Sequence, residues 1–302
     1  MKPLLYLCLL SLIVMTTISG CAQHPHRLLR EPPTQATFLQ VEGHRIRYID
    51  EGKGSPVFLI HGFGSSLEVW DDVRKQLTST HRVIAIDLLG FGHSDRPRVD
   101  YSPQAQARRV LGVMDRLGVK KAAVVAHSWG ASIALMLTLE HPERVSRLAV
   151  YNAWVYSDQL PTLFYWSRVK GLGEALAWLF YAEDVEKRLE QSFFNQDLIT
   201  FKMVEDAEYN MMRDHGVDVT LAVVRGQRFE TLETRYHTIK QPTFILWGRE
   251  DHISLLSAGV RLSDDLPHAH LKVFERCGHF TMLEAPRSTH DLITFLAQGA
   301  PS

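Results

Sequence analysis

The chain has 302 residues, of which 45% are hydrophobic and 22% are charged, a composition typical of globular proteins that excludes disorder and collagen-like repeats. Its 33 Lys and Arg residues balance 34 Asp and Glu residues, and the formal net charge of -1 provides no field that would attract a phosphate backbone. We therefore expect no nucleic-acid partner, and the length suits one α/β domain that carries an inserted subdomain.

The amino terminus has the layout of a secretory signal. Lys2 precedes an apolar stretch from Leu4 to Ile18, and the small residues Ser19 and Gly20 follow it. A permanent membrane span needs about 20 apolar residues, so this stretch is short for one. Residues 1–20 are thus predicted to be a signal peptide, with an uncleaved membrane anchor as the alternative.

The end of this segment, Ile18-Ser19-Gly20-Cys21, resembles the lipobox of bacterial lipoproteins. The resemblance implies that Cys21 becomes the first mature residue, receives lipid and holds the protein on a membrane of the bacterial cell envelope. Lipoproteins of this kind stay in the inner membrane when Asp follows the cysteine. Here Ala22 follows, so the resemblance implies the outer membrane in a diderm host.

A polar, proline-rich stretch without periodicity comes next, and residues 21–36 are predicted to form a tether. Cys8 lies in the signal and Cys21 would be acylated, which leaves Cys277 as the single thiol of the body. No intramolecular disulfide is therefore expected.

The body alternates strand and helix patterns in chain order. Two short runs at residues 37–41 and 45–49 flank a Glu-Gly turn and predict an opening hairpin. Buried strands are predicted at 56–60, 83–86, 122–126, 148–151, 243–247 and 271–274, with helices near 70–77, 103–117, 129–139 and 287–297. Apolar strands separated by helices indicate a mostly parallel sheet with helices on both faces.

One long stretch breaks this alternation. Residues 153–236 show helical periodicity without a convincing strand, and 13 of the chain's 29 aromatic residues fall between Trp154 and Arg235. This stretch is predicted to be an inserted helical lid, with 37–152 and 237–302 forming the core. Since the lid is too rich in aromatics for a thin exposed cap, we expect a few of them to line the crevice above the site.

The residues Ala126-His127-Ser128-Trp129-Gly130 join a predicted strand directly to a helix. This pattern matches the nucleophile elbow G-x-S-x-G with Ala in the first position. The small residues at both ends permit a tight turn that projects the Ser128 hydroxyl from the sheet. The amide of Trp129 would then face a developing oxyanion.

Three further motifs follow other strands. The His61-Gly62-Phe63-Gly64 segment lies where a second oxyanion donor belongs, and Phe63 would supply its amide. Asp251 and His279 each follow a later strand, giving the chain order Ser, Asp, His of this elbow-containing fold. Glu250 adjoins Asp251 and is the alternative acid.

These motifs make residues 37–300 resemble an α/β-hydrolase. The segment from Asp87 to Pro97 is similar to a loop of the subgroup that contains haloalkane dehalogenases, epoxide hydrolases, cofactor-free haloperoxidases and C–C bond hydrolases. The elbow resembles that of the dehalogenases with Ser128 in place of their Asp. A serine that attacked an alkyl carbon would form a dead-end ether, so acyl transfer to water is favoured.

We therefore expect a lipid-anchored serine hydrolase that cleaves carboxylic esters with an apolar acyl group. Ser128 would be the nucleophile, His279 the general base and Asp251 the residue that orients the imidazole. This chemistry requires no metal or organic cofactor. The alternatives are a C–C bond hydrolase and a non-catalytic binding or sensor protein with this fold; the oligomeric state stays open.

Overall fold

The computed structural model describes residues 36–180 and 185–297. The predicted signal peptide, Cys21 and all but the last residue of the predicted tether lie outside these ranges. Within them, no helix is both long and apolar enough to cross a membrane.

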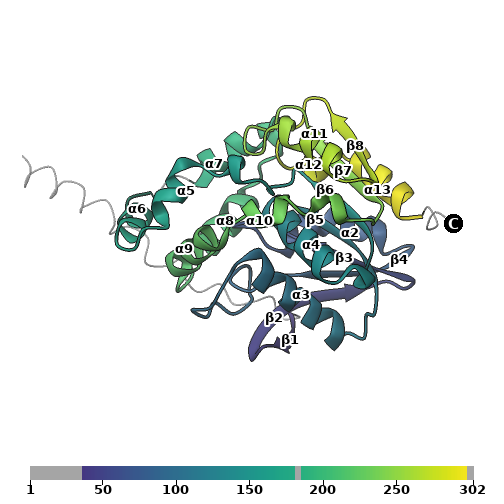
Figure 1. Ribbon diagram of the computed structural model, residues 1–302, viewed down its shortest axis with the longest axis horizontal. Helices are drawn as coiled ribbons and strands as arrows, with labels where there is room; N and C mark the ends of the chain where they lie inside the picture. Colours follow the sequence, from purple (N-terminus) through teal and green to yellow (C-terminus); the bar gives the residue numbers. More distant parts are fainter. Residues whose placement is uncertain (1–35, 181–184, 298–302) are drawn as a thin grey trace, which may run out of the picture. The chain divides into compact units, whose positions relative to one another are not determined.

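The centre of the body is an eight-stranded sheet with the order β1-β2-β4-β3-β5-β6-β7-β8 (Figure 1). Strands β1 and β2 form an antiparallel hairpin, β2 pairs antiparallel with β4, and all strands from β3 to β8 run parallel. The strands are β1 Thr37–Val41, β2 His44–Glu51, β3 Ser55–Ile60, β4 His81–Ile86, β5 Ala122–His127, β6 Val145–Tyr151, β7 Thr243–Gly248 and β8 Ala269–Phe274. The predicted mostly parallel sheet with an opening hairpin is confirmed.

Helices cover both faces of this sheet because its central strands, such as β3, β4, β5 and β7, are buried on both sides. In β3, Phe58 and Ile60 belong to one buried cluster, whereas Val57 and Leu59 belong to a second cluster on the opposite face. The first cluster includes residues of α3 Pro103–Arg116, α4 Trp129–Glu140 and α11 Leu256–Asp265; the second includes residues of α2 Asp71–Leu77, α12 Thr281–Glu284 and α13 Arg287–Ala297.

The sequence specifies the ends of α3 through local signals. The hydroxyl of Ser102 accepts a hydrogen bond from the amide of Ala105 at 3.2 Å, and Pro103 occupies the first helical position. Gly118 follows the helix with a φ of 68°, the left-handed conformation that commonly ends a helix.

A helical insertion separates β6 from β7, as predicted, and its described residues contain no strand. Its helices, teal to green in Figure 1, are α5 Thr162–Ser167, α6 Leu172–Phe180, α7 Val185–Ser192, α8 Phe201–Met212, α9 Gly216–Gly226 and α10 Glu230–Glu233. The insertion and the sheet domain share a polar and aromatic seam, in which the hydroxyl of Tyr156 donates to Asp265 Oδ2 at 2.7 Å. We call residues 153–236 the lid, as in the prediction.

Candidate active site

Ser128 lies at the junction between β5 and α4, with a φ of 51° and a ψ of -125°. This conformation is unfavourable for a residue with a side chain, so the surroundings must enforce it. The Ser128 amide donates to the carbonyl of Tyr151 at 2.9 Å, and the Ser128 carbonyl accepts from the amide of Trp154 at 3.0 Å. A Cβ at Gly130 would lie 2.4 Å from the carbonyl oxygen of His61, so the elbow requires glycine there.

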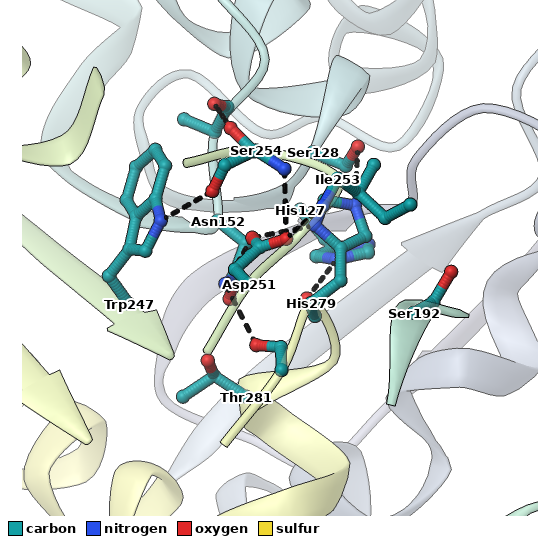
Figure 2. A network of polar contacts seen from close by, with 12 residues as sticks. His127, Ser128, Asn152, Ser192, Trp247, Asp251, Ile253, Ser254, His279 and Thr281 are labelled. Carbon is teal, nitrogen blue, oxygen red and sulfur yellow. Dashed lines mark hydrogen bonds and ion pairs between the residues drawn. The ribbon is translucent and has the colours of Figure 1, made fainter. Parts of the chain in front are cut away.

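His279 follows β8 and contacts both predicted partners (Figure 2). Its Nε2 atom lies 3.0 Å from Ser128 Oγ, and its Nδ1 atom lies 2.8 Å from Asp251 Oδ2. Because a carboxylate only accepts, Nδ1 carries the proton and Nε2 is free to accept the serine proton. The structure thus brings together the three residues that the sequence singled out.

Asp251 is 2% exposed, and four N–H groups surround its carboxylate. Oδ1 accepts from the amides of Ile253 and Ser254, each at 2.8 Å. Oδ2 accepts from His279 and from Asn152 Nδ2 at 2.8 Å. These donors offset the cost of burying a charge and fix the carboxylate relative to the imidazole.

The alternative acid, Glu250, has a different set of contacts. Its Oε2 atom accepts from the amide of Cys277 at 2.9 Å, and its own amide donates to the carbonyl of Cys277 at 3.0 Å. Glu250 therefore secures the loop that leads to His279, while Asp251 contacts the imidazole itself.

Asn152 is a site residue that the sequence analysis missed. It is fully buried, has a φ of 46°, and its Nδ2 donates to both Asp251 Oδ2 and the carbonyl of Gly278 at 3.1 Å. Its place directly after β6 was the available signal, because functional residues of a parallel sheet gather at the carboxyl ends of its strands.

On the other side of Ser128, the segment after β3 approaches the elbow. A Cβ at Gly62 would lie 2.9 Å from Ser128 Cβ, so this approach also requires glycine. Phe63 packs edge-on against Trp129, with their ring centroids 6.4 Å apart. Among the described residues, no hydrogen bond uses the amide of Phe63 or that of Trp129, which leaves both donors available.

His61 fixes this segment to the loop after β4. Its Nδ1 donates to the carbonyl of Gly62 at 2.7 Å, and its Nε2 accepts from the amide of Leu88 at 3.0 Å. Burial lowers the pKa of His61 to about 4, so the ring is neutral at pH 7 and can serve as donor and acceptor at once.

A cavity of about 620 Å³ lies above Ser128 and His279, between the sheet domain and the lid. Its aromatic wall is formed by Phe63, Phe91, Trp154, Phe164, Phe193 and Phe280. Three of these, Trp154, Phe164 and Phe193, come from the lid, as expected for a few of its aromatics. Others lie elsewhere: Tyr156 is buried in the seam, and Trp166 is 56% exposed. The side chains of Trp178, Phe180 and Tyr181 lie outside the described residues.

Residues 55–286 match the α/β-hydrolase fold family model, and the chain belongs to this family. It is therefore a hydrolase of the α/β-hydrolase fold. It is 32% identical over 280 residues to a 2-hydroxymuconate semialdehyde hydrolase of Pseudomonas putida, an alignment that covers 85% of this chain and 92% of that protein.

Two solved structures are also similar. The meta-cleavage product hydrolase CumD of Pseudomonas fluorescens IP01 superposes with a TM-score of 0.73 at 26% identity, covering 86% of this chain and 96% of CumD. A membrane phospholipase A, described as a bacterial virulence factor, superposes with a TM-score of 0.70 at 25% identity and covers 98% of both chains.

Proposed function

We propose that this protein is a serine hydrolase that cleaves carboxylic esters with an apolar acyl group through an acyl-enzyme. The observation that carries the proposal is the array of Ser128, His279 and Asp251 beneath a cavity with an aromatic wall. A pocket of this size and lining suits an apolar acyl chain, with the polar atoms of the triad at its base.

The geometry supports a complete cycle. His279 Nε2 takes the proton of Ser128 Oγ as the oxygen attacks the ester carbonyl carbon. The amides of Phe63 and Trp129 stabilise the resulting oxyanion, and His279 then protonates the departing alcohol. Water, activated in the same way, attacks the acyl-enzyme, and collapse of the second tetrahedral intermediate releases the acid and restores Ser128.

Throughout this cycle, Asp251 keeps the Nδ1 proton of His279 in place and stabilises the imidazolium. Asn152, Ile253 and Ser254 keep the carboxylate itself in place through their N–H groups.

A second candidate is hydrolysis of a C–C bond in a carboxylate-bearing dienoic compound. The Pseudomonas putida relative is named for such a compound, and one feature of the cavity favours it here. Arg96, which is 8% exposed, lines the cavity, and its Nη2 donates to Asn210 Oδ1 at 3.4 Å. A guanidinium in the cavity wall could pair with a substrate carboxylate.

We propose further that Cys21 carries lipid and holds the enzyme on the outer membrane of a diderm host. Support comes from the lipobox-like Ile18–Cys21 segment and from Ala22 after it. One of the similar solved structures is named a membrane phospholipase A. Membrane glycerolipids are accordingly the natural esters to test.

A substrate panel tests the proposal. For p-nitrophenyl esters, each added acyl methylene should raise kcat/KM about fourfold, equivalent to about 0.8 kcal/mol, until the cavity is full, and kcat/KM should then fall. The panel should include a lysophospholipid and 2-hydroxymuconate semialdehyde. A flat ester profile with efficient turnover of the semialdehyde would favour the C–C candidate, and no turnover of any compound would favour a binding or sensor protein.

A further inference from the structure

The lid is hydrogen-bonded directly to the loop that carries His279. The backbone amide of His279 donates to the carbonyl of Ser192, at the end of α7, at 2.7 Å. The bond joins residues 87 positions apart, so the position of the imidazole depends on a segment of the lid as well as on the sheet.

The carboxylate of Glu284, at the end of α12, bridges the same two segments. Its Oε1 accepts from the amide of Gly278 at 2.9 Å. Its Oε2 accepts from the amides of Phe194 and Asn195 at 2.7 and 3.1 Å. One side chain thus holds three backbone donors, one from the His279 loop and two from the lid.

The packing around this bridge leaves no room for a side chain at position 278. A Cβ at Gly278 would lie 2.7 Å from the Ser192 carbonyl oxygen and 2.8 Å from the Phe194 nitrogen. Next to it, Phe193 stacks on Phe280 with ring centroids 4.9 Å apart, and both rings line the cavity above Ser128.

We propose that Glu284 is a positioning residue that couples the lid to the catalytic base. It holds residues 192–195 against Gly278 and His279 and thereby sets the distance between His279 Nε2 and Ser128 Oγ. It reaches neither substrate nor triad atoms itself. The coupling deepens the proposed function, on which its kinetic consequences rest.

Glu284→Gln is the most direct test because it preserves side-chain length. Its amide presents an NH2 group in place of one carboxylate oxygen, so at least one of the three backbone donors loses its acceptor. We expect kcat for a short ester such as p-nitrophenyl acetate to fall roughly tenfold to hundredfold with KM nearly unchanged, because misplacement of a reacting group by about 1 Å has effects of this size. Labelling of Ser128 by a fluorophosphonate should slow by a similar factor.

Glu275→Gln is the matched control. Glu275 lies in the segment between β8 and His279, its side chain is 64% exposed, and it pairs with Arg249 outside the bridge. This variant should keep wild-type kcat. Equal kcat in Glu284→Gln and Glu275→Gln would overturn the proposal, as would a change in KM alone.

Amide hydrogen exchange tests the coupling independently of any reaction. In Glu284→Gln, exchange should accelerate at both Phe194–Asn195 and Gly278–His279. Phe193→Ala, which removes the lid ring that stacks on Phe280, should also accelerate exchange at Gly278 and His279. Faster exchange in the lid alone would overturn the coupling even if the protein hydrolyses esters, and coupled exchange in a protein that no fluorophosphonate labels would refute only the proposed function.

Discussion

Asn152 donates a hydrogen bond from Nδ2 to Asp251 Oδ2, the same oxygen that accepts the Nδ1 proton of His279. The side-chain amide of Asn152 therefore influences the His279 imidazole through the Asp251 carboxylate. It also donates to the carbonyl of Gly278, so one side chain fixes both the carboxylate and the loop before the histidine.

Asn152→Gly should lower kcat about tenfold with little change in KM, because Asp251 Oδ2 loses a hydrogen-bond donor. Glycine adopts the left-handed backbone conformation of this position without strain. Asn152→Ala should lower kcat equally and destabilise the fold by about 1 kcal/mol more, since alanine strains this conformation. Steady-state kinetics and urea unfolding of the two variants check this. Wild-type kcat in Asn152→Gly would assign the residue to folding alone.

Ser128→Ala should reduce ester hydrolysis at least about a thousandfold and leave the fold intact, because it removes only the nucleophilic oxygen. Intact mass after fluorophosphonate treatment should show one adduct in the wild type and none in the variant. An adduct on another residue, or retained activity, would refute the mechanism.

Asp251→Asn should lower kcat by about a thousandfold or more, because the amide can place the imidazole in the wrong tautomer. Glu250→Gln should have a much smaller effect, since the Glu250 carboxylate meets the amide of Cys277 and not the imidazole. Measuring kcat for both variants on one ester decides between them, and equal losses would contradict the assignment of Asp251.

Stability should fall as the pH drops from 6.5 towards 4. The pKa of His61 is about 4 in the folded protein against 6.5 for an unperturbed imidazole, so the unfolded chain binds the proton first. The stabilisation from this group is therefore fully present above pH 6.5 and lost through this window. Its maximum is about 3 kcal/mol.

The check is urea unfolding of wild type and His61→Gln across pH 4–8. The variant should be less stable at pH 7 and should show a shallower loss towards low pH. Parallel curves for the two proteins would show that other groups cause the acid loss.

Cys21→Ser should release the protein from the membrane fraction, because stable anchoring requires the acyl chains that this cysteine would carry. Cell fractionation with Ser128→Ala as the control, which should stay membrane-bound, measures the effect. Persistence of Cys21→Ser in the membrane pellet would indicate an uncleaved anchor. Inner-membrane recovery of the wild type would contradict the outer-membrane assignment.

Local patterns were enough to predict the sheet and the three residues of the array. Apolar runs identify buried strands, and Ser128, Asp251 and His279 each follow one, where parallel strands bring distant residues to a common edge. The helix near Trp70 was predicted as one element, but it begins as a 3-10 turn over Leu67–Trp70 and continues as α2.

Other features depend on tertiary contacts that no local pattern reveals. Asn152 has a short polar side chain after a strand, and its partners, Asp251 and the carbonyl of Gly278, come from distant parts of the chain. In the sequence, Glu284 has no feature that distinguishes it from other glutamates. Its proposed role depends on the lid amides of Phe194 and Asn195, which donate to its carboxylate only in the folded protein. The aromatic residues of the lid lie in the cavity wall, in the seam with the sheet domain or on the surface. Helix packing decides which place each one takes, and amino-acid composition does not predict it.

The positive φ of Ser128 also creates a conflict between stability and reactivity. Glycine would adopt this conformation with less strain, and the difference is of the order of 1–3 kcal/mol. At this one position, therefore, the side chain that is proposed to perform the chemistry also destabilises the fold. Selection for thermal stability alone would therefore favour glycine at position 128. The resulting protein would be more stable but would lack the serine hydroxyl.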